Sequence, residues 1–113
     1  MMDDRERKLY ALQAQLCQVL ADPSRLEMIR LIGTGEQTVS ELIAATGLRQ
    51  ANVSQHLSFL RQRGVVTTRR EGTTVFYRLA YPEILEACVL MRRILLRQLA
   101  DAHALVAPVT EEQ

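Results

Sequence analysis

The chain has 113 residues, of which 48% are hydrophobic and 24% are charged, and its formal net charge is +1. This length suits one domain, and the composition supports a packed core and argues against a disordered chain. The first eight residues are mostly charged with no apolar signal segment behind them, and no apolar run approaches the roughly 18 residues that span a membrane. We therefore expect one cytoplasmic domain over residues 1–113 without membrane contact, with its core at 6–106 between a frayed N-terminus (residues 1–5) and a polar tail.

Helical spacing predicts two helices in the first third of the chain. Apolar residues recur at this spacing from about residue 6 to residue 20. Asp22 and Pro23 then predict a second helix to about Ile32, because Asp caps a helix and Pro suits the first helical position. The residues expected on the apolar stripes of these helices are Leu9, Leu12, Leu16, Val19, Leu20, Leu26 and Ile29.

Residues 38–64 have the pattern of two short helices joined by a tight turn. Thr38 with Glu41 three residues later forms a capping box, which predicts a helix start, and Gly47 predicts its end. A second periodic segment begins two residues later and ends at Gly64. The pair is a helix-turn-helix, and its second helix is expected to face the core with Val53, Leu57 and Leu60.

The outward face of this second helix has small or amide side chains and no charge. Its residues are Ala51, Ser54, Gln55, Ser58 and Gln62. Small residues allow close approach to another surface, and Gln, Asn and Ser donate and accept hydrogen bonds at base edges. Such a face is typical of a helix that reads the DNA major groove. The alternative is a plain helical hairpin with a polar exterior.

A β-hairpin is predicted directly after the helix-turn-helix. Two runs rich in β-branched residues, 65–69 and 74–79, flank a turn at 70–73 that contains glycine. The predicted fold is therefore mostly α with a small β-hairpin, a winged helix-turn-helix. Arg69 and Arg70 are expected at the hairpin tip, where they suit contact with phosphate or the minor groove.

The charge of the chain is unevenly distributed. Residues 49–78 contain six arginines and one acid, Glu71, and so carry +5; because the whole chain carries +1, the remainder carries −4. A basic segment on an acidic body favours attraction of DNA to one face only. The candidate DNA-binding residues are Arg49, Gln50, Ala51, Asn52, Ser54, Gln55, Ser58, Arg69, Arg70 and Thr73.

The last predicted element is a long helix from Pro82 to about Val106. Its broad apolar face comprises Ile84, Leu85, Cys88, Met91, Ile94, Leu95, Leu99, Ala102 and Leu105. An exposed patch of this size is rare on a monomer. The first helix is the candidate partner, together with the same two helices of a second copy. We therefore expect a two-fold homodimer through the first and last helices.

Together these motifs resemble the ArsR/SmtB family of bacterial winged-helix repressors over roughly residues 8–100. The matching segments are LADPSRL at 20–26, SEL at 40–42, VSQHLSFL at 53–60, GVV at 64–66, REG at 70–72 and YRL at 77–79. The resemblance implies a homodimer that binds an imperfect inverted repeat in double-stranded DNA. It also implies repression of a promoter until an inducer, which the sequence does not identify, releases the protein.

The residues that bind metals in this family are replaced here. One family site uses two cysteines one residue apart, where this chain has Thr38 and Ser40, and neutral hydroxyls are poor ligands for soft metals. The other begins the last helix with Asp-x-His, where this chain has Tyr81 and Glu83. Asp101-Ala102-His103 matches the Asp-x-His pattern, but it lies at the far end of that helix and no second pair of ligand residues follows it. We expect no metal site and no cofactor.

Two cysteines, Cys17 and Cys88, lie on the two helices expected at the dimer interface. Three interpretations remain: packing residues, a thiol sensor of oxidants or reactive sulfur, and a site for a thiophilic metal or metalloid. Family members that sense through cysteines place one of them on the second helix, where this chain has Arg30. Because the sensing cysteine of the second helix has no counterpart here, we favour the interpretation of Cys17 and Cys88 as packing residues.

No triad spacing, phosphate loop or carboxylate pair is visible, so we do not expect an enzyme. His56, beside the core stripe of the second helix of the helix-turn-helix, is interpreted as a packing residue near phosphate. A winged helix that serves only protein–protein contact is the remaining alternative. The uncharged face and the +5 segment argue against it.

Overall fold

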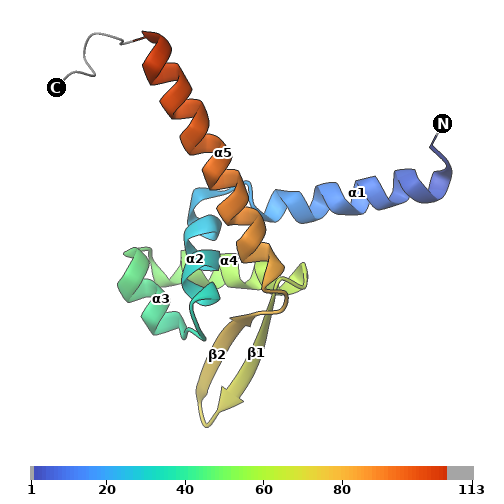
Figure 1. Ribbon diagram of the computed structural model, residues 1–113. Helices are drawn as coiled ribbons and strands as arrows, with labels where there is room; N and C mark the ends of the chain where they lie inside the picture. The colour runs from blue at the N-terminus through green and yellow to red at the C-terminus, as the bar shows by residue number, and fades with distance from the viewer. Residues whose placement is uncertain (1, 107–113) are drawn as a thin grey trace.

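The structure is a computed structural model that describes residues 2–106 (Figure 1). Within this range the elements are α1 (Asp4–Val19), α2 (Pro23–Gly33), α3 (Val39–Thr46), α4 (Gln50–Gln62), β1 (Val66–Glu71), β2 (Thr74–Leu79) and α5 (Glu83–Val106). This is the predicted winged helix-turn-helix. The predicted polar tail after Pro108 lies outside the described residues. None of the described helices is long and apolar enough to cross a membrane.

Side-chain caps fix where three of the helices begin. The Asp3 carboxylate accepts a hydrogen bond from the Glu6 N–H at 2.9 Å, so α1 starts at Asp4. The prediction that residues 1–5 are frayed is therefore wrong for the last two of them, because Asp3 satisfies a free N–H of the first turn. Asp22 caps α2 in the same way. The predicted capping box of α3 is confirmed in both directions, at 3.1 and 2.8 Å.

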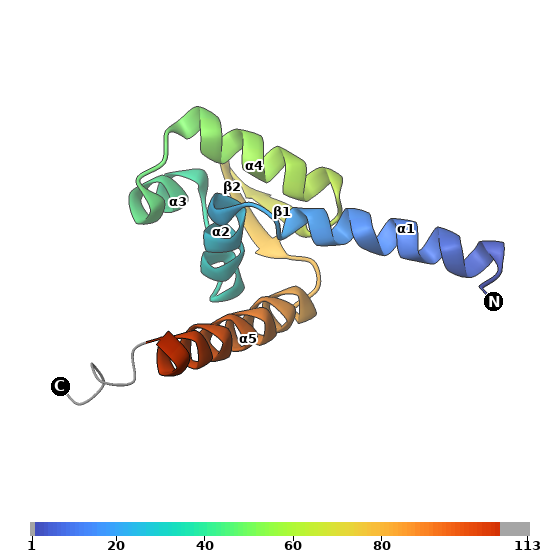
Figure 2. The same ribbon diagram turned by 90° about the horizontal axis from the view of Figure 1, so that it is seen from above.

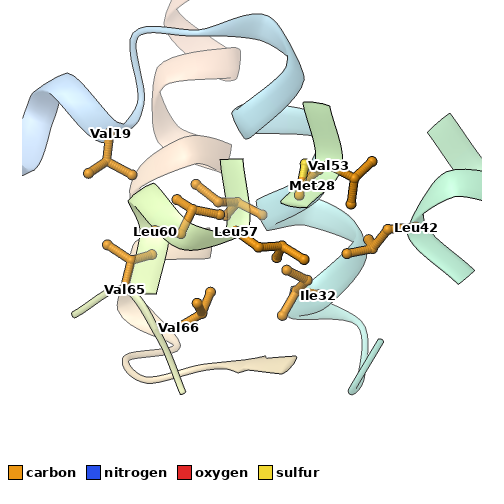
Figure 3. Close-up of a cluster of buried hydrophobic side chains, with 10 residues drawn as sticks. Val19, Met28, Ile32, Leu42, Val53, Leu57, Leu60, Val65 and Val66 are labelled. Carbon is orange, nitrogen blue, oxygen red and sulfur yellow. The ribbon is translucent and has the colours of Figure 1, made fainter. Parts of the chain in front are cut away.

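The core lies between α2, α3, α4 and the base of the hairpin. Figure 3 shows side chains of α2, α4 and the start of β1 converging on one another. Leu26, expected in the core, is only half-buried because it lies at the edge of the stripe of α2, whereas Met28 and Ile32 are buried. The buried residues are Val19, Met28, Ile29, Ile32, Leu42, Val53, Leu57, Leu60, Val65 and Val66.

The hairpin is longer and tighter than predicted. The two strands are antiparallel from Val66↔Leu79 to Glu71↔Thr74, which leaves only Gly72 and Thr73 in the turn. Gly72 has φ +63°, and a glycine in this conformation at the first of two turn residues matches the type II′ hairpin turn. The first strand therefore runs to residue 71 instead of residue 69. Arg69 and Arg70 lie within the strand and not at the tip.

The helices α1 and α5 extend away from this compact body in different directions (Figures 1 and 2). Val19 is the one buried residue of α1, and in α5 only Ile84, Leu85 and Cys88 are half-buried among the residues whose burial is described. The radius of gyration is 18.1 Å, whereas a compact domain of this length has about 13 Å. We call α1 and α5 the two arms. Within one chain the first arm covers little of the second, so α1 of the same chain is not the cover expected for the apolar face of α5, and the second copy remains the predicted partner.

Candidate nucleic-acid interface

The outer face of α4 is fully open to solvent. The turn before α4 is held by Gly47, which has φ +74°, and by Thr46, whose hydroxyl donates to the Leu42 carbonyl at 2.7 Å and accepts from the Leu48 N–H at 3.2 Å. The buried stripe of α4 points the other way, as the sequence predicts. The exposed residues on and just before α4 are Arg49, Gln50, Ala51, Asn52, Ser54, Gln55, Ser58, Arg61 and Gln62, of which the first seven are candidate DNA-binding residues.

The N-terminus of α4 is electrostatically suited to an anion. Arg49 precedes the helix, and neither its side chain nor any other caps the first turn. The helix contains no acidic residue. Uncapped N–H groups and the positive end of the helix dipole favour phosphate at such a position.

Arg69 lies on the hairpin of β1 and β2, which we call the wing, and two carboxylates hold its side chain. Its Nε lies 2.8 and 2.9 Å from the two oxygens of Glu36, and its Nη1 lies 2.8 Å from Glu71. Its guanidinium also stacks on Phe76, 4.3 Å from the ring centroid. The charge of Arg69 is therefore paired with carboxylates of the same chain, although its side chain is exposed. No local sequence pattern indicates that Glu36, 33 positions from Arg69, contacts it. Glu36 is therefore not among the residues predicted for the site.

Arg70 and Thr73 are the exposed candidates left on the wing. Arg70 forms no ion pair within residues 2–106, and both residues are exposed. Alternation along the strand places Arg70 on the opposite face from Arg69. Arg78 is also exposed, and its Nε donates to the Thr67 hydroxyl at 3.3 Å. Among the described residues, the guanidinium groups of Arg70 and Arg78 thus form no salt bridge. The hydrogen bond from Arg69 lowers the pKa of the Glu36 carboxyl, and Arg78 lies near enough to that carboxyl to add to this effect.

His56 is half-buried beside Asp22, as expected for a packing residue. Its Nε2 lies 3.8 Å from the Asp22 carboxylate, which also accepts from the Arg25 N–H at 3.0 Å. That hydrogen bond, more than the neighbouring His56, lowers the pKa of Asp22. Among residues 2–106 no group of three or more His, Cys, Asp or Glu side chains is arranged to hold a metal ion.

The two cysteines differ in their surroundings, and both are free thiols. Cys17 is exposed and lines a cleft of about 580 Å³ between the end of α1, the Gly64–Val65 segment and the start of α5. Cys88 is half-buried against the core, and burial raises the pKa of its thiol. In one chain Cys17 is not covered, because α1 projects from the body, and its packing at the dimer interface stays a prediction.

Known proteins resemble this chain in sequence and in fold. A profile described as "bacterial regulatory protein, arsR family" matches residues 22–68, which hold α2, α3, α4 and the start of β1. The HTH-type transcriptional regulator Rv0081 of Mycobacterium tuberculosis is 37% identical over 99 residues, covering 87% of each chain. The chain belongs to the ArsR family of bacterial regulatory proteins. Its similarity to the biofilm growth-associated repressor of Agrobacterium fabrum is 46% identity over 67 residues, 59% of this chain and 57% of that one.

Solved structures of similar proteins share the arrangement described above. The crystal structure of Rv0081 superposes with a TM-score of 0.75 at 38% identity, covering 83% of this chain and 95% of that one. A solution structure from Mycobacterium bovis, described as a homodimeric winged helix-turn-helix DNA-binding domain, has a TM-score of 0.73 at 31% identity over 91% of each chain. The fold and family predicted from the sequence are confirmed.

Proposed function

We propose that this ArsR-family chain is a homodimeric transcriptional repressor that binds an inverted repeat in double-stranded DNA and is released by an inducer. The observation that carries the proposal is the outer face of α4. The residues of this face, Ala51, Ser54, Gln55, Ser58 and Gln62, are exposed, uncharged and rich in amide and hydroxyl groups. The N-terminus of the same helix has no side-chain cap, and the wing carries exposed arginines. This combination suits a helix seated in the major groove.

Each part of the interface has a distinct task in this proposal. Gln55, with Ser54 and Ser58 beside it, reads base edges, and Asn52 and Ala51 allow close approach at the start of the helix. Arg49, Gln50 and the free N–H groups of the first turn bind phosphate. On the wing, Arg70 and Thr73 contact the backbone of the DNA. Arg69 is a positioning residue, because Glu36 and Glu71 already neutralise its charge.

The two arms provide the dimer interface. The chain exposes 8638 Å², whereas a compact monomer of its mass exposes about 6300 Å². Each partner of a standard-sized specific interface buries about 800 Å². The large apolar residues exposed on the arms are Leu9, Tyr10, Leu12, Leu16, Val89, Leu90, Met91, Ile94, Leu95, Leu96 and Leu99. A second copy covers these faces.

This function places the protein in the cytoplasm with bacterial DNA, and it assigns no catalytic role. The relatives named above include a repressor and a homodimeric DNA-binding domain. They support the proposal that this chain represses transcription and that it does so as a homodimer. A winged helix that bound only other proteins would not require the exposed amide and hydroxyl groups on α4, whereas a reader of base edges does.

A gel shift with the DNA upstream of the gene tests the proposal. The wild type is expected to shift this DNA, with affinity falling steeply as salt rises, and not to shift unrelated DNA at the same concentration. Gln55→Ala should change the base preference at one position, costing about 1–3 kcal/mol there. Gln18→Ala, an exposed glutamine on α1, is the matched control and should bind as the wild type does. The result expected is that the Gln55 variant no longer distinguishes the bases at that one position and keeps the preference of the wild type elsewhere, and an unchanged preference at every position would argue against α4 as the reader.

A further inference from the structure

Phe59, on the recognition helix α4, lies between two guanidinium groups. The Arg25 guanidinium from α2 is 4.4 Å from the ring centroid, and that of Arg63 is 4.7 Å from it. Neither arginine forms an ion pair with a carboxylate within residues 2–106. We call these three residues the arginine joint.

Both arginines of the joint bind the end of α1. Arg25 donates from Nε to the Val19 carbonyl at 2.9 Å and from Nη2 to the Gln18 carbonyl at 2.8 Å, and Arg63 donates from Nη1 to the Gln15 carbonyl at 3.4 Å. The last turn of α1 has no basic residue of its own. Carbonyls at a helix C-terminus lack partners within the helix and carry the negative end of its dipole. The Gln18 carbonyl also accepts from the Ala21 N–H at 3.1 Å, and Gln15 lies one turn before the end of α1, so at these two positions the arginines add a second donor. Cations from α2 and the end of α4 thus lie at the negative end of the α1 dipole.

This attachment is the main link between the first arm and the body. Val19 is the one buried side chain of α1, with Leu20 half-buried after it. A single apolar anchor fixes the position of a helix end but leaves its direction free to pivot. Three directed hydrogen bonds to carbonyls of that end remove much of this freedom.

We propose that Arg25, Phe59 and Arg63 are positioning residues that set the angle between the dimer arm α1 and the recognition helix, and thereby the half-site spacing that the dimer accepts. The inference rests on the proposed function, since it requires a dimer held through the arms. A 16-residue helix is about 24 Å long, so a tilt of about 10° at its base moves its far end by about 4 Å. One base pair is about 3.4 Å. A tilt of about 10° at the arginine joint therefore moves the far end of α1 by about the length of one base pair.

The test compares operators whose two half-sites are separated by spacers of different length. Phe59→Leu keeps an apolar side chain against the core but removes the ring between the guanidiniums. Arg25→Lys keeps the charge but removes the fork that binds two carbonyls, and Arg25 is not among the proposed DNA contacts. Phe76→Leu is the matched control, because it removes the ring beneath Arg69 on the wing and leaves the joint intact.

The wild type is expected to prefer one spacer over those one base pair longer or shorter by about tenfold. Phe59→Leu and Arg25→Lys should flatten this preference to about threefold or less, while affinity for an isolated half-site stays unchanged. Phe76→Leu should weaken binding at every spacer and keep the ratio. A preference retained in both joint variants overturns the inference, and so does uniform weakening or dissociation of both dimers. If the wild type binds no inverted repeat at all, the proposed function itself fails.

Discussion

Arg69 donates a bifurcated hydrogen bond to Glu36, with its Nε 2.8 and 2.9 Å from the two carboxylate oxygens. Next to this contact, Gln37 and Tyr77 exchange backbone hydrogen bonds of 3.0 and 2.8 Å. The segment before α3 is thereby joined to both strands of the wing. The direction of the wing relative to the helix-turn-helix depends on this join.

The two neighbouring arginines of the wing should behave differently on substitution. Arg70→Gln should weaken binding to all DNA sequences and lower the salt dependence by about one phosphate contact, because its charge is free. Arg69→Gln should instead speed amide exchange at Gln37 and Tyr77, because it releases the wing. Affinity at several salt concentrations and hydrogen exchange measure both effects. A loss of salt dependence for Arg69→Gln with no change in exchange would show that Arg69 contacts phosphate directly.

The Glu36 carboxyl should titrate at lower pH than an ordinary glutamate. The hydrogen bond from Arg69 lowers its pKa from the usual 4.5. A carboxyl whose pKa is lowered by folding stabilises the folded state above its unfolded pKa, and this contribution is lost as pH falls through the lowered value. The attachment of the wing should therefore weaken only in acid. Titration of the side-chain carboxyl by NMR should show the Glu36 midpoint rising toward 4.5 in Arg69→Gln; an unmoved midpoint would contradict the contact.

A charge on the apolar face of α5 should prevent dimer formation. Leu95 is 52% exposed in one chain and lies on the face that the proposal assigns to the second copy. Leu95→Glu buries an unpaired carboxylate there, which is strongly unfavourable, and should give a 12.8 kDa monomer or an unfolded chain. Arg30→Glu, an exposed residue of α2 outside the arms, is the matched control and should remain dimeric. Sedimentation and circular dichroism distinguish the cases, and a well-folded Leu95→Glu dimer would refute this interface.

The two thiols should react at different rates. Cys17 is exposed, whereas burial raises the pKa of Cys88 and lowers its thiolate fraction at neutral pH. Iodoacetamide labelling followed by mass spectrometry should therefore modify Cys17 first. If both cysteines are packing residues, hydrogen peroxide, persulfide and arsenite should all fail to release DNA. Release that disappears in both Cys17→Ser and Cys88→Ser would instead assign sensing to the pair.

Local signals predicted most of the helices correctly. The capping box of Thr38 and Glu41 and the stop at Gly47 depend on residues within one turn, and these appear in the structure where the pattern places them. The core stripe of α4 follows from helical period alone, and so does the outward orientation of Gln55. All ten candidate DNA-binding residues are exposed.

Contacts between distant segments could not be predicted in this way. The turn at 70–73 is compatible with more than one register, and only the pairing of the strands places Arg69 inside β1. Its partner Glu36 and the joint of Arg25 with Phe59 and Arg63 involve separations that no local pattern records. The divergence of α1 and α5 is likewise a property of the tertiary structure, and it leaves Cys17 exposed in one chain.

Selection from a pool of random DNA duplexes is the most direct test that a homodimer of this chain reads an inverted repeat. The protein is incubated with the pool, bound duplexes are amplified and sequenced, and the recovered site is returned to the protein to measure stoichiometry. We predict an imperfect inverted repeat bound by two chains, with tighter binding than to either half-site alone. Recovery of no shared sequence, or of a single half-site bound by one chain, would contradict the account.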